Sequence, residues 1–364
     1  MSSLVVSSYT PALGSGRALR TYAIVRALAA AGPVDLLYTR FGAPAPSAEF
    51  TAIEGVRLHE LVPTRGARRA FAVARALASG APRAVARGVS AELAHAAARL
   101  AAAPGRDRVV ATDPMAALAL APLARTRPVI YDAQNLESSF RTDWGSRQRV
   151  ERFERALLER SAETWMPSPA DIAGARALAP TAILRLVPNV VDVAAIEPVT
   201  GAGTHALMVA DFTYDPNREG LDFLLSDVLP LAWETAPDLR LLVAGRGLDG
   251  AGDDERVTVL GFVDSLAPLY ASAACAVVPL LTGGGSPLKF VEALAYGLPV
   301  VATPRAAAGL DARAGEHYLE GADGPGLARA LLTAVGGAPA IAAAGRALAE
   351  REYSIEALIA RLAA

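Results

Sequence analysis

The sequence predicts an α/β protein with two domains, each built on a parallel sheet. Near the N-terminus, an apolar strand at 4–8 leads through a glycine-containing loop to a helix at 17–31 and a second strand at 34–38. A strand, a helix and a second strand in this order form a unit whose strands run parallel. A second series of the same kind begins near residue 206. At 364 residues the chain is long enough for two separate cores.

Apolar runs bounded by turn residues predict the other elements of the first half. Strands are expected at 109–112, 128–132, 163–166 and 184–192. Helices are expected in short pieces within 64–105, after Asp113-Pro114, over 147–160 and from Pro169. The polar residues 133–137 follow a strand end, where open α/β sheets bind ligands.

The second half repeats the alternation. Strands are expected at 206–210, 239–244, 257–260, 276–281 and 300–303, and helices from Tyr214, over 266–273 and over 354–364. Pro, Gly and Thr in residues 193–204 predict a linker. We therefore expect domains at 1–193 and 194–350, followed by a C-terminal helix at 351–364.

Composition indicates an ordinary globular protein. Hydrophobic residues make up 52% of the chain and charged residues 20%, so a disordered chain is excluded. The one cysteine, Cys275, lies in an apolar run and is expected to be buried. The N-terminus shows no signal-peptide pattern, and no apolar run approaches the length of a membrane span. We expect a cytoplasmic protein.

Charge is distributed unevenly although the net charge is only −2. Residues 1–195 contain 24 arginines and 16 acidic residues, a balance of +8, and the remainder carries −10. The basic half is expected to meet an anionic acceptor or, at most peripherally, a membrane face. The alternative is an arginine-rich surface that only contacts water.

A glycine loop between two predicted strands is the strongest functional signal. Residues 282–299 contain a glycine triplet, then Ser286 and Pro287 as expected helix start, and Gly297 as expected helix end. Backbone N–H groups at such a helix start bind anions, most often phosphate. Lys289 follows the loop and is the single lysine among 35 basic residues. A compact ammonium suits a tight phosphate site better than a guanidinium does.

The residues 239–310 resemble the C-terminal domain of retaining glycosyltransferases of the GT-B fold, family 4. The matching strings are Leu241–Gly245, Gly261–Asp264, Leu269-Tyr270, Gly283–Pro299 and Ala306–Leu310. Val187–Asp192 resembles the interdomain hinge of that family, and 14–22 and 131–137 resemble parts of its N-terminal domain. The resemblance implies two Rossmann-like domains that face each other across a cleft, with the C-terminal helix packing back on the N-terminal domain.

The resemblance also implies roles for individual residues. Catalytic roles fall on Lys289, Arg218 and Gln134. Contacts with the sugar donor fall on Gly283, Gly284, Gly285, Ser286, Glu292, Arg246, Phe262, Val263 and Gly16. Glu292 matches the residue that holds the ribose hydroxyls, and Phe262 with Val263 frames the nucleobase. No metal ligand is implied.

Three positions depart from the pattern of the family. Gly284 stands where many members have an acidic residue, so the chain resembles the subgroup with a glycine triplet. Pro287 stands where that subgroup often carries arginine, and Gln134 where many members have histidine. An acid or base role at Gln134 is therefore in doubt, whereas hydrogen bonding to a sugar is still open to it.

The implied reaction is a retaining, metal-independent transfer of a sugar from a nucleoside-diphosphate sugar, with uridine the commonest base, to an acceptor hydroxyl. No separate cofactor and no nucleic acid is expected. Two alternatives stay open from the sequence. One is a related nucleotide-sugar enzyme such as an epimerase, and the other is a catalytically degenerate nucleotide-sugar-binding scaffold.

Overall fold

The computed structural model describes residues 1–40, 45–63, 66–139, 145–199, 203–248, 254–283 and 285–363. The chain forms two compact units, which we call unit 1 (Met1–Pro188 with Leu358–Ala364) and unit 2 (Asn189–Ala357). The division lies earlier than the linker expected at 193–204. Residues after Pro188 join unit 2 because their backbone bonds to it: the N–H of Val191 donates to Tyr353, and that of Val199 donates to Tyr296.

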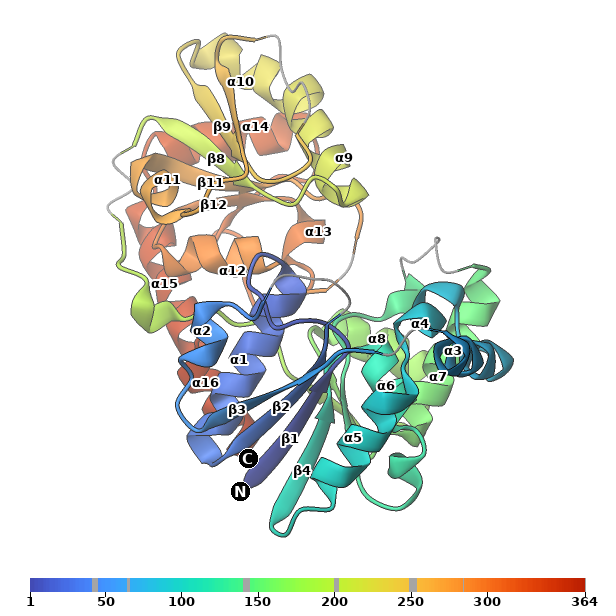
Figure 1. Cartoon of the computed structure of the whole chain (residues 1–364). Helices are drawn as coiled ribbons and strands as arrows, with labels where there is room; N and C mark the ends of the chain where they lie inside the picture. Colours follow the sequence, from blue (N-terminus) through green and yellow to red (C-terminus); the bar gives the residue numbers. More distant parts are fainter. Residues whose placement is uncertain are drawn as a thin grey trace. The chain divides into compact units, whose positions relative to one another are not determined.

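Unit 1 contains a seven-stranded, fully parallel sheet in the order β3-β2-β1-β4-β5-β6-β7 (Figure 1). Its strands are β1 (Ser2–Ser7), β2 (Val34–Thr39), β3 (Val56–Leu61), β4 (Arg106–Ala111), β5 (Ile130–Asp132), β6 (Glu163–Met166) and β7 (Leu184–Leu186). The order reverses direction beside β1, so the carboxyl ends of β1 and β4 flank the switch point where such sheets bind ligands.

Both faces of this sheet are covered, as a parallel sheet requires. Its helices are α1 (Gly16–Ala31), α2 (Ala48–Thr51), α3 (Ala67–Ala78), α4 (Arg83–Gly88), α5 (Ala91–Ala101), α6 (Pro114–Leu120), α7 (Arg147–Arg160) and α8 (Pro169–Leu178), with 3₁₀ turns at Leu123–Arg125 and Glu137–Ser139. Leu4 and Val6 on β1 pack into one core with α5, α6 and α7. Side chains alternate along a strand, so Val5 points to the other face. Helix α1 packs against β1 and β2, and Ile24 and Leu28 are among its buried residues.

Unit 2 contains a six-stranded parallel sheet in the order β10-β9-β8-β11-β12-β13. Its strands are β8 (His205–Val209), β9 (Arg240–Ala244), β10 (Val257–Gly261), β11 (Ala273–Val278), β12 (Val300–Ala302) and β13 (Leu319–Glu320). Strands β8 and β11 are adjacent, although β9, β10 and the helices α9, α10 and α11 lie between them in sequence. The switch point of this second sheet therefore lies between them.

Helices also cover both faces of the second sheet. They are α9 (Asp215–Phe223), the π-helical turn Leu224–Val228, α10 (Leu229–Thr235), α11 (Ala267–Ser272), α12 (Leu288–Ala295), α13 (Pro304–Ala307), α14 (Gly324–Val335) and α15 (Pro339–Glu352), with a 3₁₀ turn at Val193–Ala195. A last helix, α16 (Ile355–Ala363), follows α15 in the chain. One core contains Leu207 and Ala276 with α12 and α15, and the other contains Met208 and Cys275 with α9, α10 and α14. The predicted burial of Cys275 is confirmed.

The last helix, α16, belongs to unit 1 from Leu358 onwards. Within that unit, Arg108 donates a hydrogen bond to the carbonyl of Leu362 at 3.4 Å, and Arg185 donates one to the carbonyl of Arg361. Cations near the end of a helix stabilise its unpaired carbonyls. The packing of the C-terminal helix on N-terminal residues is thus the arrangement that the sequence predicted.

Local sequence signals place most helix ends correctly. Asp113 caps α6 by accepting from Met115 and Ala116, both at 2.9 Å, and Gly297 ends α12 with a φ of 71°. The expectation for Ser286 is wrong: α12 begins at Leu288 after Pro287, and Ser286 makes no capping bond. Strand β3 was not anticipated, since at the sheet edge its residues are half-buried or exposed and none is buried.

Among the described residues, no single helix has both the length and the apolar character needed to cross a membrane. The helices Gly324–Val335 and Pro339–Glu352 are long and apolar enough when taken together, but the chain bends by 95° between them.

Candidate active site

A cluster of polar side chains lies at the carboxyl edge of the second sheet, which we call the β8–β11 site. It is built from the segment after β8, the segment after β9, the helix α11, the glycine loop after β11 and the first turns of α9 and α12. These elements converge because all the strands are parallel, so their carboxyl ends meet at one edge. The side chains that matter come from Asn217, Arg218, Arg246, Tyr270, Lys289 and Glu292.

Lys289 lies in the first turn of α12 and reaches across to α9. Its ammonium donates a hydrogen bond to the side-chain oxygen of Asn217, which is 7% exposed. Asn217 is itself oriented by its NH₂ group, which donates to the carbonyl of Asp211 at 2.7 Å. Burial lowers the pKa of Lys289 to about 7, because no carboxylate among the described residues compensates its charge. An incoming anion would restore that charge.

Glu292 lies one helical turn beyond Lys289, on the same side of α12. Its carboxylate accepts a hydrogen bond from the hydroxyl of Tyr270 at 3.2 Å. Tyr270 is fully buried and its ring stacks on Tyr296, with 4.2 Å between ring centroids. Burial raises the pKa of Glu292 to about 7, and the Tyr270 hydrogen bond opposes this rise. The structure shows no ion pair between Glu292 and Lys289 within its described residues, so the two charges are available separately.

The glycine loop needs its glycines for conformation. Gly283 and Gly285 have φ values of 98° and 78°, a region that other residues adopt only with strain. Gly309 packs so closely that a side chain there would reach within 2.1 Å of the carbonyl of Gly285. Ser286 is buried, its hydroxyl has no partner among the described residues, and its carbonyl accepts from Asn189 at 2.8 Å. The predicted site residue Gly284 lies outside the described residues.

Two arginines flank the site in exposed positions. Arg218 donates to the carbonyl of Phe212 at 2.9 Å from the first turn of α9. Arg246 follows β9, where its guanidinium lies 3.8 Å from the carboxylate of Asp211 and 5.7 Å from the ring centroid of Phe262. The Phe262 ring is 62% exposed, which leaves one face free to stack on a planar ligand. Val263, half-buried, follows it in the chain.

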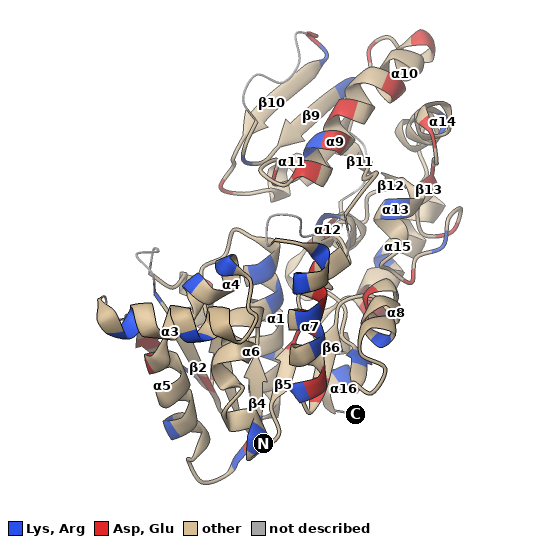
Figure 2. Ribbon diagram, turned by 90° about the vertical axis from the view of Figure 1, so that its right-hand side faces the viewer, with Lys and Arg blue, Asp and Glu red and all other residues tan. Residues whose placement is uncertain are grey.

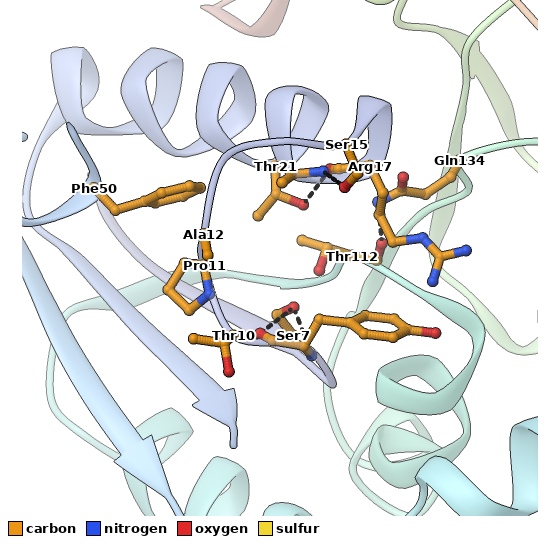
Figure 3. A pocket seen from close by; sticks show the side chains of 12 residues that line it. Ser7, Thr10, Pro11, Ala12, Ser15, Arg17, Thr21, Phe50, Thr112 and Gln134 are labelled. Carbon is orange, nitrogen blue, oxygen red and sulfur yellow. Dashed lines mark hydrogen bonds between the residues drawn. The ribbon is translucent and has the colours of Figure 1, made fainter. Parts of the chain in front are cut away.

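The two other predicted site residues belong to unit 1. Gln134 follows β5, is 7% exposed, and donates to the carbonyl of Thr112 at 2.8 Å. It lines a cavity of about 430 Å³ at the carboxyl end of β1, with Phe50 at one end and Gln134 beside Arg17 at the other (Figure 3). Gly16 begins α1 and is exposed at the mouth of this region.

The cavity combines apolar walls with hydroxyl groups. Its lining is Ser7, Tyr9, Thr10, Pro11, Ala12, Ser15, Arg17, Ala18, Thr21, Phe50, Thr112 and Gln134. The guanidinium of Arg17 lies over the ring of Tyr9, 4.5 Å from its centroid, and has no ion-pair partner in the described part of the chain. Such a lining suits a ligand with apolar and hydroxyl-bearing surfaces and an anionic group.

Buried carboxylates hold the loop that carries Gln134. Glu154 on α7 accepts from the backbone of Glu137 at 2.7 Å and of Ser138 at 3.0 Å, and Asp171 accepts from Leu136 at 3.2 Å. Burial raises the pKa of Glu154 to about 7. These bonds fix the loop backbone, and they explain why charged residues occupy the buried faces of α7 and α8.

Sequence reasoning missed three residues of the β8–β11 site. Asn217 and Asn189 fix Lys289 and the glycine loop, and Tyr270 fixes Glu292. Their signal in the sequence was weak, because an Asn at a helix start is typical of a cap and a Tyr in an amphipathic helix is typical of a core residue.

Within the described residues, no group of three or more His, Cys, Asp or Glu side chains could hold a metal ion.

Residues 203–349 match the model of the family described as glycosyl transferases group 1. No curated protein matches the chain in sequence. Among solved structures, sucrose-phosphate synthase from Thermosynechococcus elongatus is similar over 100% of this chain and 98% of its own, with 19% identity and a TM-score of 0.75. The Anabaena protein HepE, solved with UDP and glucose, is similar over 99% and 98%, with 15% identity and a TM-score of 0.71.

The apo form of the lipopolysaccharide outer core galactosyltransferase WaaB is also similar, over 100% of this chain and 98% of that one, at 10% identity and a TM-score of 0.65. These likenesses extend over both units, and identities this low inform on fold alone. Together with the two parallel sheets, they show that the chain has the GT-B fold predicted from its sequence.

Proposed function

We propose that the protein is a retaining glycosyltransferase that moves a sugar from a nucleoside-diphosphate sugar to an acceptor hydroxyl without a metal ion. The observation that carries the proposal is the placement of Lys289 and Glu292 on one side of α12. This helix directly follows the glycine loop, in which Gly283 and Gly285 have positive φ. The match of residues 203–349 to glycosyl transferases group 1 supports it.

The sugar donor is proposed to bind along the carboxyl edge of the second sheet. Backbone N–H groups of the glycine loop and the start of α12 face the diphosphate, and Lys289 adds one positive charge. Glu292, whose two oxygens accept hydrogen bonds, holds the ribose hydroxyls. Phe262 and Val263 bracket the base, and Arg218 with Arg246 adds positive charge at the rim. The structures of HepE with UDP and with UDP-glucose favour UDP as the nucleotide.

In the proposed reaction, the bond between the sugar C1 and the β-phosphate oxygen breaks, and its electron pair stays on the diphosphate. The acceptor oxygen forms the new bond to C1, and its proton passes to the diphosphate. Retention follows if the acceptor attacks from the face that the leaving group vacates. Lys289 and the N-terminus of α12 stabilise the charge that develops on the diphosphate, which is where such a site lowers the barrier most.

The cavity at the end of β1 is proposed to bind the acceptor. Its hydroxyl groups and Gln134 suit hydrogen bonding to a polyol, and Arg17 suits an anionic group on the same molecule. Gln134 is proposed to position the acceptor, since its amide group neither gains nor loses a proton near neutral pH. Cytoplasmic location stays a prediction.

The test is the Lys289→Ala variant, assayed for release of UDP from a panel of UDP-sugars with and without candidate acceptors. We expect loss of turnover by a factor of about 10² to 10³, with an unchanged circular dichroism spectrum. Arg329→Ala, an exposed change on α14, is the matched control and should keep full activity. Near-normal turnover by Lys289→Ala would refute the assignment of the site.

The same assay separates the alternatives. An epimerase converts the sugar donor to an isomer and releases no UDP in proportion to product, so product analysis by NMR distinguishes it. A binding scaffold would be stabilised by UDP yet would form neither product nor free UDP from UDP-sugars. Retention is tested by comparing the anomeric configuration of the transferred sugar with its configuration in the donor, and the same configuration means retention. Activity in the presence of EDTA tests metal independence.

A further inference from the structure

A continuous segment of unit 1 is strongly basic. Residues 61–91 contain six arginines and no acidic residue, whereas the chain as a whole has 35 basic and 37 acidic residues. The segment comprises the end of β3, the helices α3 and α4, and the start of α5. None of its residues belongs to the β8–β11 site or lines the cavity at the end of β1.

The structure brings the arginine-bearing helices α3 and α4 into contact, and we call their exposed side the α3–α4 surface. The guanidinium of Arg69 on α3 donates to the carbonyl of Arg87 on α4 at 2.8 Å, so the two helices are tied together. Arg149 at the start of α7 donates to the carbonyl of Ala81 at 3.2 Å, which adds a further cation from outside the segment. Figure 2 shows basic residues on α3, α4 and α7.

Most of these charges have no internal counterpart. The exposed residues Arg68, Arg75, Arg83 and Arg87 form no ion pair within the described residues. Like charges held close together repel one another, and salt or an anionic partner relieves the repulsion. A surface of this kind therefore favours an anionic partner over water alone.

The same surface exposes large apolar side chains. Phe71 on α3 is 71% exposed, and Val62 just before the segment's first helix is 65% exposed. On α3, Arg68, Phe71 and Arg75 follow one another at spacings of three and four residues, so they share the outward side of the helix. The only buried residues of this helix are the small residues Ala72 and Ala76. The helix thus presents an aromatic ring between two guanidinium groups.

We propose that the α3–α4 surface docks the protein on a membrane containing anionic lipids. An exposed ring flanked by arginines matches the interface of a bilayer, where the ring enters the headgroup region and the guanidinium groups pair with lipid phosphates. A soluble polyanion would engage the arginines but would give Phe71 no apolar surroundings. The inference is independent of the proposed transferase activity.

The first experiment measures binding of the full chain to vesicles by co-sedimentation. We expect binding to an equal mixture of phosphatidylcholine and phosphatidylglycerol, little binding to phosphatidylcholine alone, and release by high salt. The double variant Arg68→Gln/Arg75→Gln should bind roughly tenfold more weakly. Its control, Arg329→Gln/Arg351→Gln, removes two exposed charges from unit 2 and should bind as the wild type does. Equal binding to both vesicle types would overturn the proposal.

The second experiment tests entry of the aromatic side chain. Phe71→Trp should show a blue-shifted emission and quenching by brominated lipids when mixed vesicles are added. Ile183→Trp, at a position 64% exposed in the same unit but outside the segment, should show neither. Inorganic polyphosphate serves as the soluble polyanion. Binding to mixed vesicles without a Phe71→Trp response, or the same response with polyphosphate, would show a charge-only site and refute membrane docking.

Discussion

Lys289 donates its hydrogen bond to a neutral amide oxygen, that of Asn217, rather than to a carboxylate. The two residues are 72 positions apart, on the first turns of α12 and α9. A neutral partner orients the ammonium without cancelling its charge, so the charge is free to act on a bound anion. The same arrangement leaves the ammonium desolvated, and burial lowers the pKa of Lys289 to about 7.

This lowered pKa predicts an alkaline fall in activity. The charged form of Lys289 is needed at the diphosphate, so above about pH 7, where Glu292 is ionised, kcat/KM for the sugar donor should decrease as pH rises. In Lys289→Arg, the guanidinium stays charged at all these pH values, and the alkaline fall should disappear while kcat drops because the broad group fits poorly. The measurement is kcat/KM between about pH 6 and pH 9.

The control for this profile is Arg329→Lys, which places a new lysine on the exposed side of α14. It should retain the wild-type profile. An unchanged alkaline limb in Lys289→Arg would mean that another group titrates, and the role assigned to Lys289 would then be wrong.

The ribose contact proposed for Glu292 predicts a preference for UDP over a nucleotide that lacks a ribose hydroxyl. If its carboxylate holds the ribose, the wild type should bind UDP about 10- to 100-fold more tightly than 2′-deoxy-UDP, as expected for a hydrogen bond to a charged group. In Glu292→Gln that ratio should shrink towards one. Titration calorimetry at pH 8, above the raised pKa of about 7, keeps the carboxylate ionised in the wild type.

Two variants accompany this comparison. Tyr270→Phe removes the hydroxyl that orients Glu292 yet keeps the carboxylate, and it should lower the ratio only in part. Glu234→Gln, exposed on α10, should leave it unchanged. A full preference for UDP in Glu292→Gln would place the ribose elsewhere.

Much of the fold could be predicted from the sequence because its signals are local. Buried parallel strands are short apolar runs, and helix starts such as Asp113 and Ser168 carry their caps within three residues. Strand β3 was not predicted because it lies at the sheet edge, where none of its residues is buried and no apolar run is needed. Ser286 misled because serine before proline reads as a cap, whereas the loop here turns its hydroxyl inward.

The site could be predicted only in part, for a physical reason. Lys289 and Glu292 lie in one helix, so their spacing is visible in the chain. Their partners Asn217 and Tyr270 come from other elements, 72 and 22 positions away, and tertiary packing alone brings them together. The cavity around Gln134 likewise collects residues from 7 to 134, which no local pattern reveals.

A buried ion pair in unit 1 predicts a large effect on stability. Arg20 donates to one oxygen of Asp132 from Nε at 3.0 Å and from Nη2 at 2.6 Å, and both residues are almost fully buried. Asp132→Ala should lower the free energy of unfolding by about 3–5 kcal/mol, because it removes the buried carboxylate that compensates the charge of Arg20. Urea denaturation at pH 7 measures the change.

Two comparisons show whether the loss of this compensating charge is the cause. Arg20→Met/Asp132→Leu removes both charges and should recover most of the lost stability. Glu151→Ala breaks the exposed pair with Arg147 and should cost less than about 1 kcal/mol. If the double variant is as unstable as Asp132→Ala, packing rather than charge explains the loss.

Glu154 predicts a pH dependence of stability with a definite sign. Its pKa is raised to about 7 by burial, against an ordinary value of 4.5, so the folded state binds more protons between these pH values. Its contribution to stability is therefore complete below about pH 4.5 and falls as pH rises through 7. Glu154→Gln should reduce the difference in the free energy of unfolding between pH 5 and pH 8 by about 2 kcal/mol.

The variant should also be less stable than the wild type at pH 5, since one amide oxygen replaces a carboxyl group that serves the N–H groups of both Glu137 and Ser138. Urea denaturation at the two pH values separates this constant loss from the change in slope. Equal slopes in variant and wild type would show that Glu154 does not titrate in this range.

Gly245, at the end of β9 beside the sugar-donor site, predicts a severe effect of adding a single methyl group. Its φ is 146°, and a Cβ there would lie 1.6 Å from the carbonyl oxygen of Ala210. Gly245→Ala should therefore cost more than about 4 kcal/mol or prevent folding of unit 2. Gly315→Ala is the matched control, with a φ of 77° and open space, and should cost about 1 kcal/mol. Thermal unfolding of the two variants separates the effect of a steric clash from that of backbone strain alone. Similar losses of stability in both variants would show that β8 and β9 can move apart to admit the methyl group.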